Sequence, residues 1–210
     1  LYNYWHHIGS GVPCGQGGIR LDDAISGVLI YGNVFYKCSE SNFGGVQIHG
    51  GKENLVDNCI FADCKFGISF SGWGKAGWDK FLKGHEAQLY KDIDITKPPY
   101  STRYPDLARI TEDEGVNMVW RNIAYRCGEF LTRDRGIQQV VDNFVTAEDP
   151  GFVNADKGDF DLKDNATVLR ESNFRPIPFG EIGLYNDELR ASWPVEHEVS
   201  PNYQPEKRGE

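Results

Sequence analysis

Short stretches of alternating apolar and polar residues recur along the first half of the chain. Residues 18–22 (Gly-Ile-Arg-Leu-Asp), 45–49 (Gly-Val-Gln-Ile-His) and 67–71 (Gly-Ile-Ser-Phe-Ser) have the same pattern. Strict alternation predicts short strands with one buried face and one exposed face. The apolar positions expected to face the core are Ile19, Leu21, Val46, Ile48, Ile68 and Phe70.

A second kind of stretch repeats between these strands. Residues 30–38 match residues 56–64, and residues 119–127 resume the pattern; all three end in Cys. Self-similarity at a period of roughly 20–50 residues indicates a stacked architecture. One such unit cannot bury its apolar face alone, whereas stacked units share a continuous core. The sequence therefore predicts an all-β fold, a right-handed parallel β-helix that forms a single-stranded solenoid.

The repeat also suggests how the chain is organised. We expect β-helix coils in residues 1–149, with a long loop insertion at residues 72–115 in which residues 80–90 form a short helix. Residues 150–210 lose the pattern and are expected to form an extended C-terminal segment packed on the β-helix. The chain begins at Leu1, and an uncovered strand edge invites pairing. We therefore expect a β-helix incomplete at its N-terminal end, covered by missing N-terminal coils or by another chain.

Charge and cysteine content narrow the function classes. The net charge of −9 argues against a nucleic-acid partner, which a basic surface would attract. No apolar run is long enough to cross a membrane. Cys38, Cys64 and Cys127 recur at one position of the repeat, so we expect them to stack inside the coils. Cys14 and Cys59 are the candidate pair if the chain contains a disulfide.

The outer face of the first two strands carries candidate catalytic chemistry. Arg20 and Asp22 would lie beside Gln47 and His49 of the next coil, with Asp23 just past the strand end. When two carboxyl groups lie close together, their repulsion raises the pKa of one of them, and a nearby Arg lowers the pKa of the other. One group can then act as the acid and the other as the base. Asp22, Asp23 and His49 are therefore the catalytic candidates, and Arg20 and Gln47 the candidates for binding sugar hydroxyls. The alternative is that the two aspartates only cap a turn.

The insertion leaves the repeat directly after the third of these strands and is rich in aromatic residues. Exposed aromatic rings stack on sugars, and an Arg can bind a carboxylate. We predict that Trp73, Trp78, Arg103 and Tyr104 form the wall of a substrate groove. The alternative is that the aromatic side chains only anchor the insertion on the β-helix.

Two sets of motifs carry a resemblance to known families. Asp22-Asp23, followed by Ile48-His49-Gly50-Gly51, resembles the Asp-Asp and Gly-His-Gly motifs of polygalacturonase-type glycoside hydrolases, in which the aspartates are acid and base and the His supports them. Their Asn-Thr-Asp and Arg-Ile-Lys motifs are not present. Further stretches are similar to bacterial right-handed β-helix proteins of polysaccharide-degradation loci, namely the C-terminal half of glycoside hydrolase family 141: residues 18–23, 31–36, 44–51 and 182–194.

This resemblance implies a pectin-lyase-like, carbohydrate-active enzyme that is secreted or periplasmic. We expect a glycoside hydrolase, or the C-terminal part of one, that cleaves an oligo- or polysaccharide of plant or algal cell walls by carboxylate acid/base catalysis, without a cofactor. One alternative is a polysaccharide lyase, in which aspartates hold Ca²⁺ and Arg20 abstracts a proton. A second alternative is a non-catalytic, carbohydrate-binding β-helix. If other coils supply a catalytic group, this chain alone would be inactive.

Overall fold

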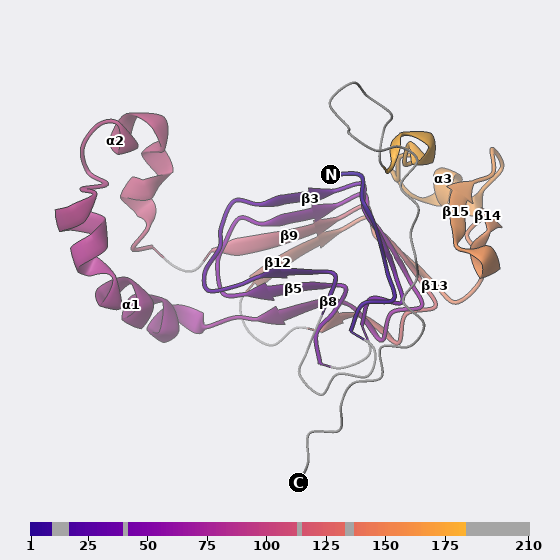
Figure 1. Ribbon diagram of the computed structural model, residues 1–210, viewed down its shortest axis with the longest axis horizontal. Helices are drawn as coiled ribbons and strands as arrows, with labels where there is room; N and C mark the ends of the chain where they lie inside the picture. Colours follow the sequence, from indigo (N-terminus) through magenta and orange to yellow (C-terminus); the bar gives the residue numbers. More distant parts are fainter. Residues whose placement is uncertain (10–16, 40–41, 113–114, 133–136, 184–210) are drawn as a thin grey trace, which may run out of the picture.

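The computed structural model contains three parallel sheets that run along the molecule (Figure 1). It describes residues 1–9, 17–39, 42–112, 115–132 and 137–183. Sheet A contains β1 (Tyr4–His6), β4 (Val34–Tyr36), β7 (Ile60–Ala62), β10 (Ile123–Tyr125) and β13 (Phe144–Thr146). Sheet B contains β2 (Ile19–Leu21), β5 (Val46–His49), β8 (Phe66–Ser71) and β11 (Glu129–Thr132). Sheet C contains β3 (Leu29–Tyr31), β6 (Leu55–Asp57), β9 (Val116–Trp120) and β12 (Ile137–Val141).

The chain visits the three sheets in turn, one strand in each, and then begins the next coil. Each strand of these three sheets pairs in parallel with the equivalent strand one coil away, for example β2 with β5 and β5 with β8. This arrangement confirms the prediction of a parallel β-helix. Within the described residues, β1, β2 and β3 each have a neighbour on one side only.

Aromatic stacking fills the interior of the coils. The rings of Phe35 and Phe61, from adjacent coils, are parallel with centroids 4.9 Å apart, and Phe130 packs on Phe61 at 5.9 Å. Among the inward-facing positions of sheet B, Leu21, Val46, Ile48, Ile68 and Phe70 are buried and Ile19 is half-buried, as the alternation predicts. Apolar side chains stacked in this way share one continuous core along the solenoid.

Three cysteines occupy equivalent positions in successive coils. Cys38 and Cys64 are buried, and Cys127 is half-buried, which confirms that they stack inside. All three thiols are free, and burial raises the pKa of Cys38 to about 12, so this thiol stays protonated. Cys59 is also a free, buried thiol, and Cys14 lies outside the described residues.

Asparagines hold the corner between sheets C and A. The Nδ2 of Asn122 donates to the Oδ1 of Asn143 at 2.8 Å, and Asn3 makes the same bond to Asn33 at 2.9 Å. Asn33 and Asn122 are almost fully buried. Because buried amides need partners, these side chains satisfy one another from coil to coil. They have a structural role, as their positions in the sequence indicate.

Residues 150–183 cover the outer face of sheet A. They form β14 (Phe152–Asn154), η3 (Ala155–Lys157), β15 (Asp159–Leu162), α3 (Thr167–Glu171) and η4 (Phe179–Glu181), with β14 and β15 antiparallel. Phe152 and Phe160 are fully buried in a second cluster that includes Val34, Ile60 and Ile123 of sheet A. The expected extended segment therefore contains a hairpin in its described part; residues 184–210 lie outside the described residues.

The insertion between β8 and β9 is helical rather than a long loop. It contains α1 (Gly74–Gly84), the π-helix η1 (Gln88–Asp92), α2 (Tyr100–Arg103) and η2 (Pro105–Arg109), and we call residues 74–109 the helical arm. The arm projects from the corner between sheets B and C (Figure 1, left). The helix expected at residues 80–90 is replaced by α1, which begins at Gly74 and ends at Gly84. Trp78, Phe81 and Leu82 have the spacing of an apolar helix face, which accounts for the earlier start. Among the described helices, none is both long and apolar enough to span a membrane.

Candidate functional site

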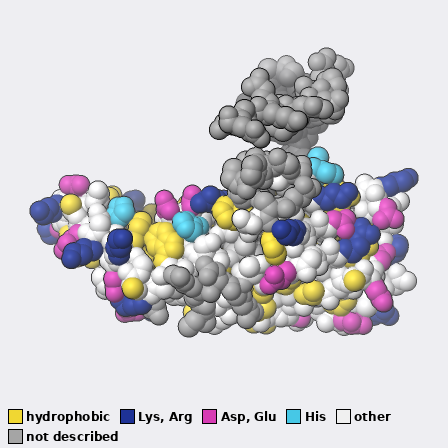
Figure 2. Space-filling view, turned by 90° about the horizontal axis from the view of Figure 1, so that it is seen from below, with side chains coloured by type: hydrophobic (Ala, Val, Ile, Leu, Met, Phe, Trp, Pro, Cys, Tyr) yellow, Lys and Arg dark blue, Asp and Glu magenta, His cyan; other side chains and the backbone are white. Residues whose placement is uncertain are grey.

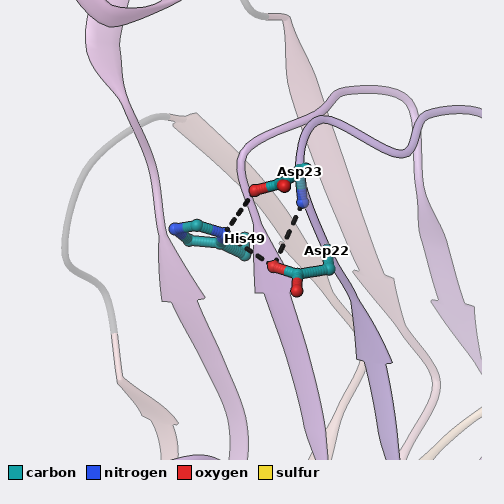
Figure 3. Close-up of side chains that lie close together, drawn as sticks. All are labelled: Asp22, Asp23 and His49. Atoms are coloured by element: carbon teal, nitrogen blue, oxygen red, sulfur yellow. Dashed lines mark hydrogen bonds and ion pairs between the residues drawn. The ribbon is translucent and has the colours of Figure 1, made fainter.

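The corner where β2 and β5 end brings together the three predicted catalytic residues. The strands pair in register, Arg20 opposite Gln47 and Leu21 opposite Ile48, so Asp22 at the end of β2 lies beside His49, the last residue of β5. The Nδ1 of His49 is 2.8 Å from the Oδ1 of Asp22 and 3.5 Å from the Oδ1 of Asp23 (Figure 3). The imidazole thus bridges two carboxylates from the preceding coil.

The Oδ1 atom of Asp22 is the centre of this cluster. It accepts a hydrogen bond from the Nη2 of Arg20 at 2.8 Å and another from the backbone N–H of Asp23 at 3.2 Å, besides its contact with His49. Desolvation opposes ionisation, but the bonds and charges of Arg20 and His49 outweigh it and lower the pKa of Asp22. Asp22 is therefore held as a carboxylate.

A left-handed turn directs Asp23 toward the same point. Asp23 and Ala24 have φ values of 47° and 66°, a region that non-glycine residues seldom adopt. The N–H of Ala24 bonds to the carbonyl oxygen of His49 at 3.1 Å, which ties this turn to the next coil. The Asp23 side chain is 76% exposed and that of Asp22 47%, so both carboxylates are open to solvent.

The cluster also offers converging ligand atoms. One atom each from Asp22, Asp23 and His49 lies within 4.8 Å of the others. Two carboxylates and one imidazole provide fewer oxygens than the six to eight that Ca²⁺ prefers. Arg20 adds a positive charge beside Asp22, which opposes a bound cation. The arrangement therefore suits proton transfer better than calcium binding.

Trp73 covers one side of the imidazole. Its ring lies edge-on to the ring of His49, with centroids 5.5 Å apart, and it also contacts Phe81 of the helical arm at 5.0 Å. Gly50 makes this approach possible: its φ is +69°, and an added Cβ would lie 2.8 Å from the Trp73 ring. Trp73 thus lies next to the cluster and links it to the arm.

Two of the predicted substrate-binding residues are buried rather than exposed. Gln47 is only 1% exposed; its side chain accepts a hydrogen bond from the hydroxyl of Ser69 and donates one to Ser71 at 2.9 Å, so it braces neighbouring coils. Trp78 is 3% exposed, and its Nε1 donates to the carbonyl oxygen of Ile110 at 2.9 Å. Trp78 is therefore an anchor of the arm, the alternative that the sequence left open.

Arg103 and Tyr104 lie on the helical arm and are exposed. They line a cavity of about 590 Å³ between the arm and the turn that follows Asp23. The structure thus places them near the same corner but on the cavity rather than on the carboxylate cluster. Sequence reasoning missed this cavity, although the spacing of Trp78, Phe81 and Leu82 indicates one of its walls.

Comparisons of the chain with protein-family models, with curated proteins and with solved structures give no match. Its fold and the geometry of this corner are therefore the basis on which a function is assigned.

Proposed function

We propose that the chain is a glycoside hydrolase of the β-helix type, or the C-terminal part of one, that acts on a plant or algal cell-wall polysaccharide. The observation that supports this most directly is the cluster in which His49 bridges Asp22 and Asp23 at a solvent-open corner. The resemblance of the chain to pectin-lyase-like enzymes, and to glycoside hydrolase family 141 in particular, is part of the same proposal. So does a secreted or periplasmic location, since the substrate lies outside the cell.

The spacing of the carboxyl groups favours a retaining mechanism. One oxygen of Asp22 lies within 4.8 Å of one oxygen of Asp23. Retaining glycosidases hold their carboxyl groups about 5–5.5 Å apart, whereas inverting ones leave about 6.5–9.5 Å for a water molecule. The oxygen–oxygen approach of Asp22 and Asp23 is closer to the retaining spacing than to the inverting one.

In this mechanism the hydrogen bonds of Asp22 decide its role, and Asp23 takes the remaining one. Asp22, ionised by its bonds to Arg20 and His49, attacks the anomeric carbon and forms a glycosyl ester. Asp23 takes the role of general acid and gives a proton to the departing glycosidic oxygen. Asp23 then takes a proton from water, which attacks the anomeric carbon and releases Asp22. His49 positions both groups and does not form a bond with the sugar.

The test is incubation of the purified chain with a panel of cell-wall polysaccharides. We expect new reducing ends without an ultraviolet-absorbing unsaturated product. Asp22→Asn and Asp23→Asn should each lower kcat by about 10²–10⁴-fold while binding, followed by affinity electrophoresis, persists. Asp164→Asn, an exposed aspartate in the segment that covers sheet A, is the matched control and should retain full activity. If the chain is part of a longer protein, the same variants are made in that protein.

Two other results would replace this proposal. An unsaturated product whose formation stops when calcium is chelated would indicate a polysaccharide lyase with Asp22 and Asp23 as ligands. Binding of a polysaccharide that is never cleaved, and that survives both Asp→Asn changes, would indicate a carbohydrate-binding β-helix.

A further inference from the structure

The cavity under the helical arm is apolar and well bounded. Helix α1 forms one wall and the segment around η2 the opposite one, while the turns of the first two coils form the floor. Its volume of about 590 Å³ is within the range of roughly 300–1,000 Å³ that is typical of small-molecule sites. The main apolar lining residues are Trp78, Phe81, Leu82, Leu89, Leu107 and Ile110. Figure 2 shows hydrophobic side chains gathered where the arm meets the body of the β-helix.

The cavity lies near the carboxylate cluster, with the Trp73 ring between Phe81 of the cavity wall and His49 of the cluster. Ala24, which lines the floor, directly follows Asp23 in the chain. On the other side Phe81 lines the wall and contacts the Trp73 ring, which in turn packs on His49. A group held in the cavity would therefore be adjacent to a sugar at the acid/base pair.

The lining determines which chemistry fits. Polar side chains such as Glu53, Gln88 and Asp106 also line the cavity, but most of its surface is apolar, whereas every hydroxyl group of an unmodified sugar needs a hydrogen-bond partner. The buried Trp78 does not offer an open ring face for stacking a sugar either. A flat, apolar ring, in contrast, is removed from water by contact with Phe81, Leu89 and Leu107.

Arg103 lies at the rim of the cavity, beside other polar lining residues such as Tyr104 and Asp106. Arg103 is exposed there, and among the described residues its guanidinium has neither an ion-pair nor a hydrogen-bond partner. A guanidinium has several fixed N–H donors and no acceptor, so it selects an oxygen acceptor. Lys52, the cation on the floor, lies 6.0 Å above the Trp78 ring.

We propose that this cavity is a subsite for an aromatic acyl group esterified to the sugar chain, with the ring between the arm and the β-helix and the ester carbonyl oxygen at Arg103. That the aromatic ester is attached to a sugar rests on the proposed function. That the cavity binds an aromatic ester does not depend on it. The substrate class would then be an aryl-esterified polysaccharide rather than an unsubstituted one.

Methyl cinnamate, an aromatic ester without a sugar, is the probe for the cavity alone. A dissociation constant of about 1 mM is expected for a ligand of this size, measured by saturation-transfer NMR and by quenching of tryptophan fluorescence. Leu107→Glu and Leu89→Glu place a charge in the wall and should each weaken binding at least tenfold. Ile93→Glu, on the arm but outside the cavity, is the matched control, because Ile93 is already 47% exposed. Circular dichroism verifies folding, and either wall variant suffices if the other does not fold.

Further measurements separate this idea from the proposed function. The double variant Asp22→Asn/Asp23→Asn should bind methyl cinnamate as the unchanged chain does, whether or not the cluster is catalytic. If the chain cleaves a polysaccharide, kcat/KM should be at least tenfold higher for cinnamoylated than for de-esterified oligosaccharides, and Leu107→Glu should remove that preference. The subsite is refuted if methyl cinnamate does not bind, if binding survives both wall variants, or if sedimentation shows a dimer whose formation Leu107→Glu and Leu89→Glu abolish.

Discussion

Replacing Gly50 by Ala tests how the corner of the β-helix is built. Gly50 has a φ of +69°, and a side chain in that left-handed conformation costs roughly 1–2 kcal/mol. The new Cβ would also lie 2.8 Å from the Trp73 ring, well inside the roughly 3.5–4.0 Å of a carbon–carbon contact. Forcing such an overlap adds about 1–3 kcal/mol, so Gly50→Ala should lower the free energy of unfolding by about 3 kcal/mol.

Gly27 provides a matched control for the backbone cost. Its φ of +73° is nearly the same, but a Cβ added there meets nothing within 4 Å. Gly27→Ala should therefore lose only about 1–2 kcal/mol. Urea unfolding followed by tryptophan fluorescence measures both variants, and the difference between them isolates the displacement of Trp73. Because Trp73 packs on His49, Gly50→Ala should also lower polysaccharide cleavage. Equal losses of stability in the two variants would refute this account of the corner.

Three further changes test other contacts. Burial opposes the ionisation of Asp22 and Arg20 promotes it, so Arg20→Gln should raise the pKa of Asp22. The acidic limb of the kcat/KM–pH profile should then move to higher pH. An acidic limb that does not move would contradict this. Phe61→Ala removes a fully buried ring from the core stack and should cost about 3–5 kcal/mol in urea unfolding; a loss below about 1 kcal/mol would be inconsistent with that packing. Trp78→Phe leaves the carbonyl oxygen of Ile110 without its indole donor, so the free energy of unfolding should fall by about 1 kcal/mol and proteolysis within the arm should become faster. An unchanged rate of proteolysis would show that this hydrogen bond does not hold the arm.

The repeat made the fold predictable. In a parallel stack with equivalent strands in register, the period-two alternation of each strand determines its inward side chains, and Val46, Ile48 and Ile68 are buried as expected. The same register determines that Asp22 and His49 are neighbours across two coils. Both results follow from local patterns that the stack repeats, so the sequence was sufficient for them.

Burial of a side chain by distant segments of the chain could not be predicted from these local patterns. Gln47 lies on the outer face of sheet B, yet it is buried, since a position on an outer face can still be covered by other parts of the chain. Trp78 lines the cavity under the arm but is almost fully buried, and its burial depends on where the arm folds, which the sequence does not indicate. The bonds that Arg20 and His49 both make to one oxygen of Asp22, and the lowered pKa that results, likewise required coordinates.

The central claim is that Asp22 and His49 act as one catalytic unit, and a double-mutant cycle tests it most directly. On a polysaccharide for which the proposed cleavage is detected, kcat/KM is measured for the unchanged chain, Asp22→Asn, His49→Gln and the double variant. Groups that act together are strongly non-additive, so each single change should cost about 10²-fold or more and the double variant should be no worse than the poorer single one. Full activity in either single variant, or losses that simply multiply in the double variant, would contradict the claim.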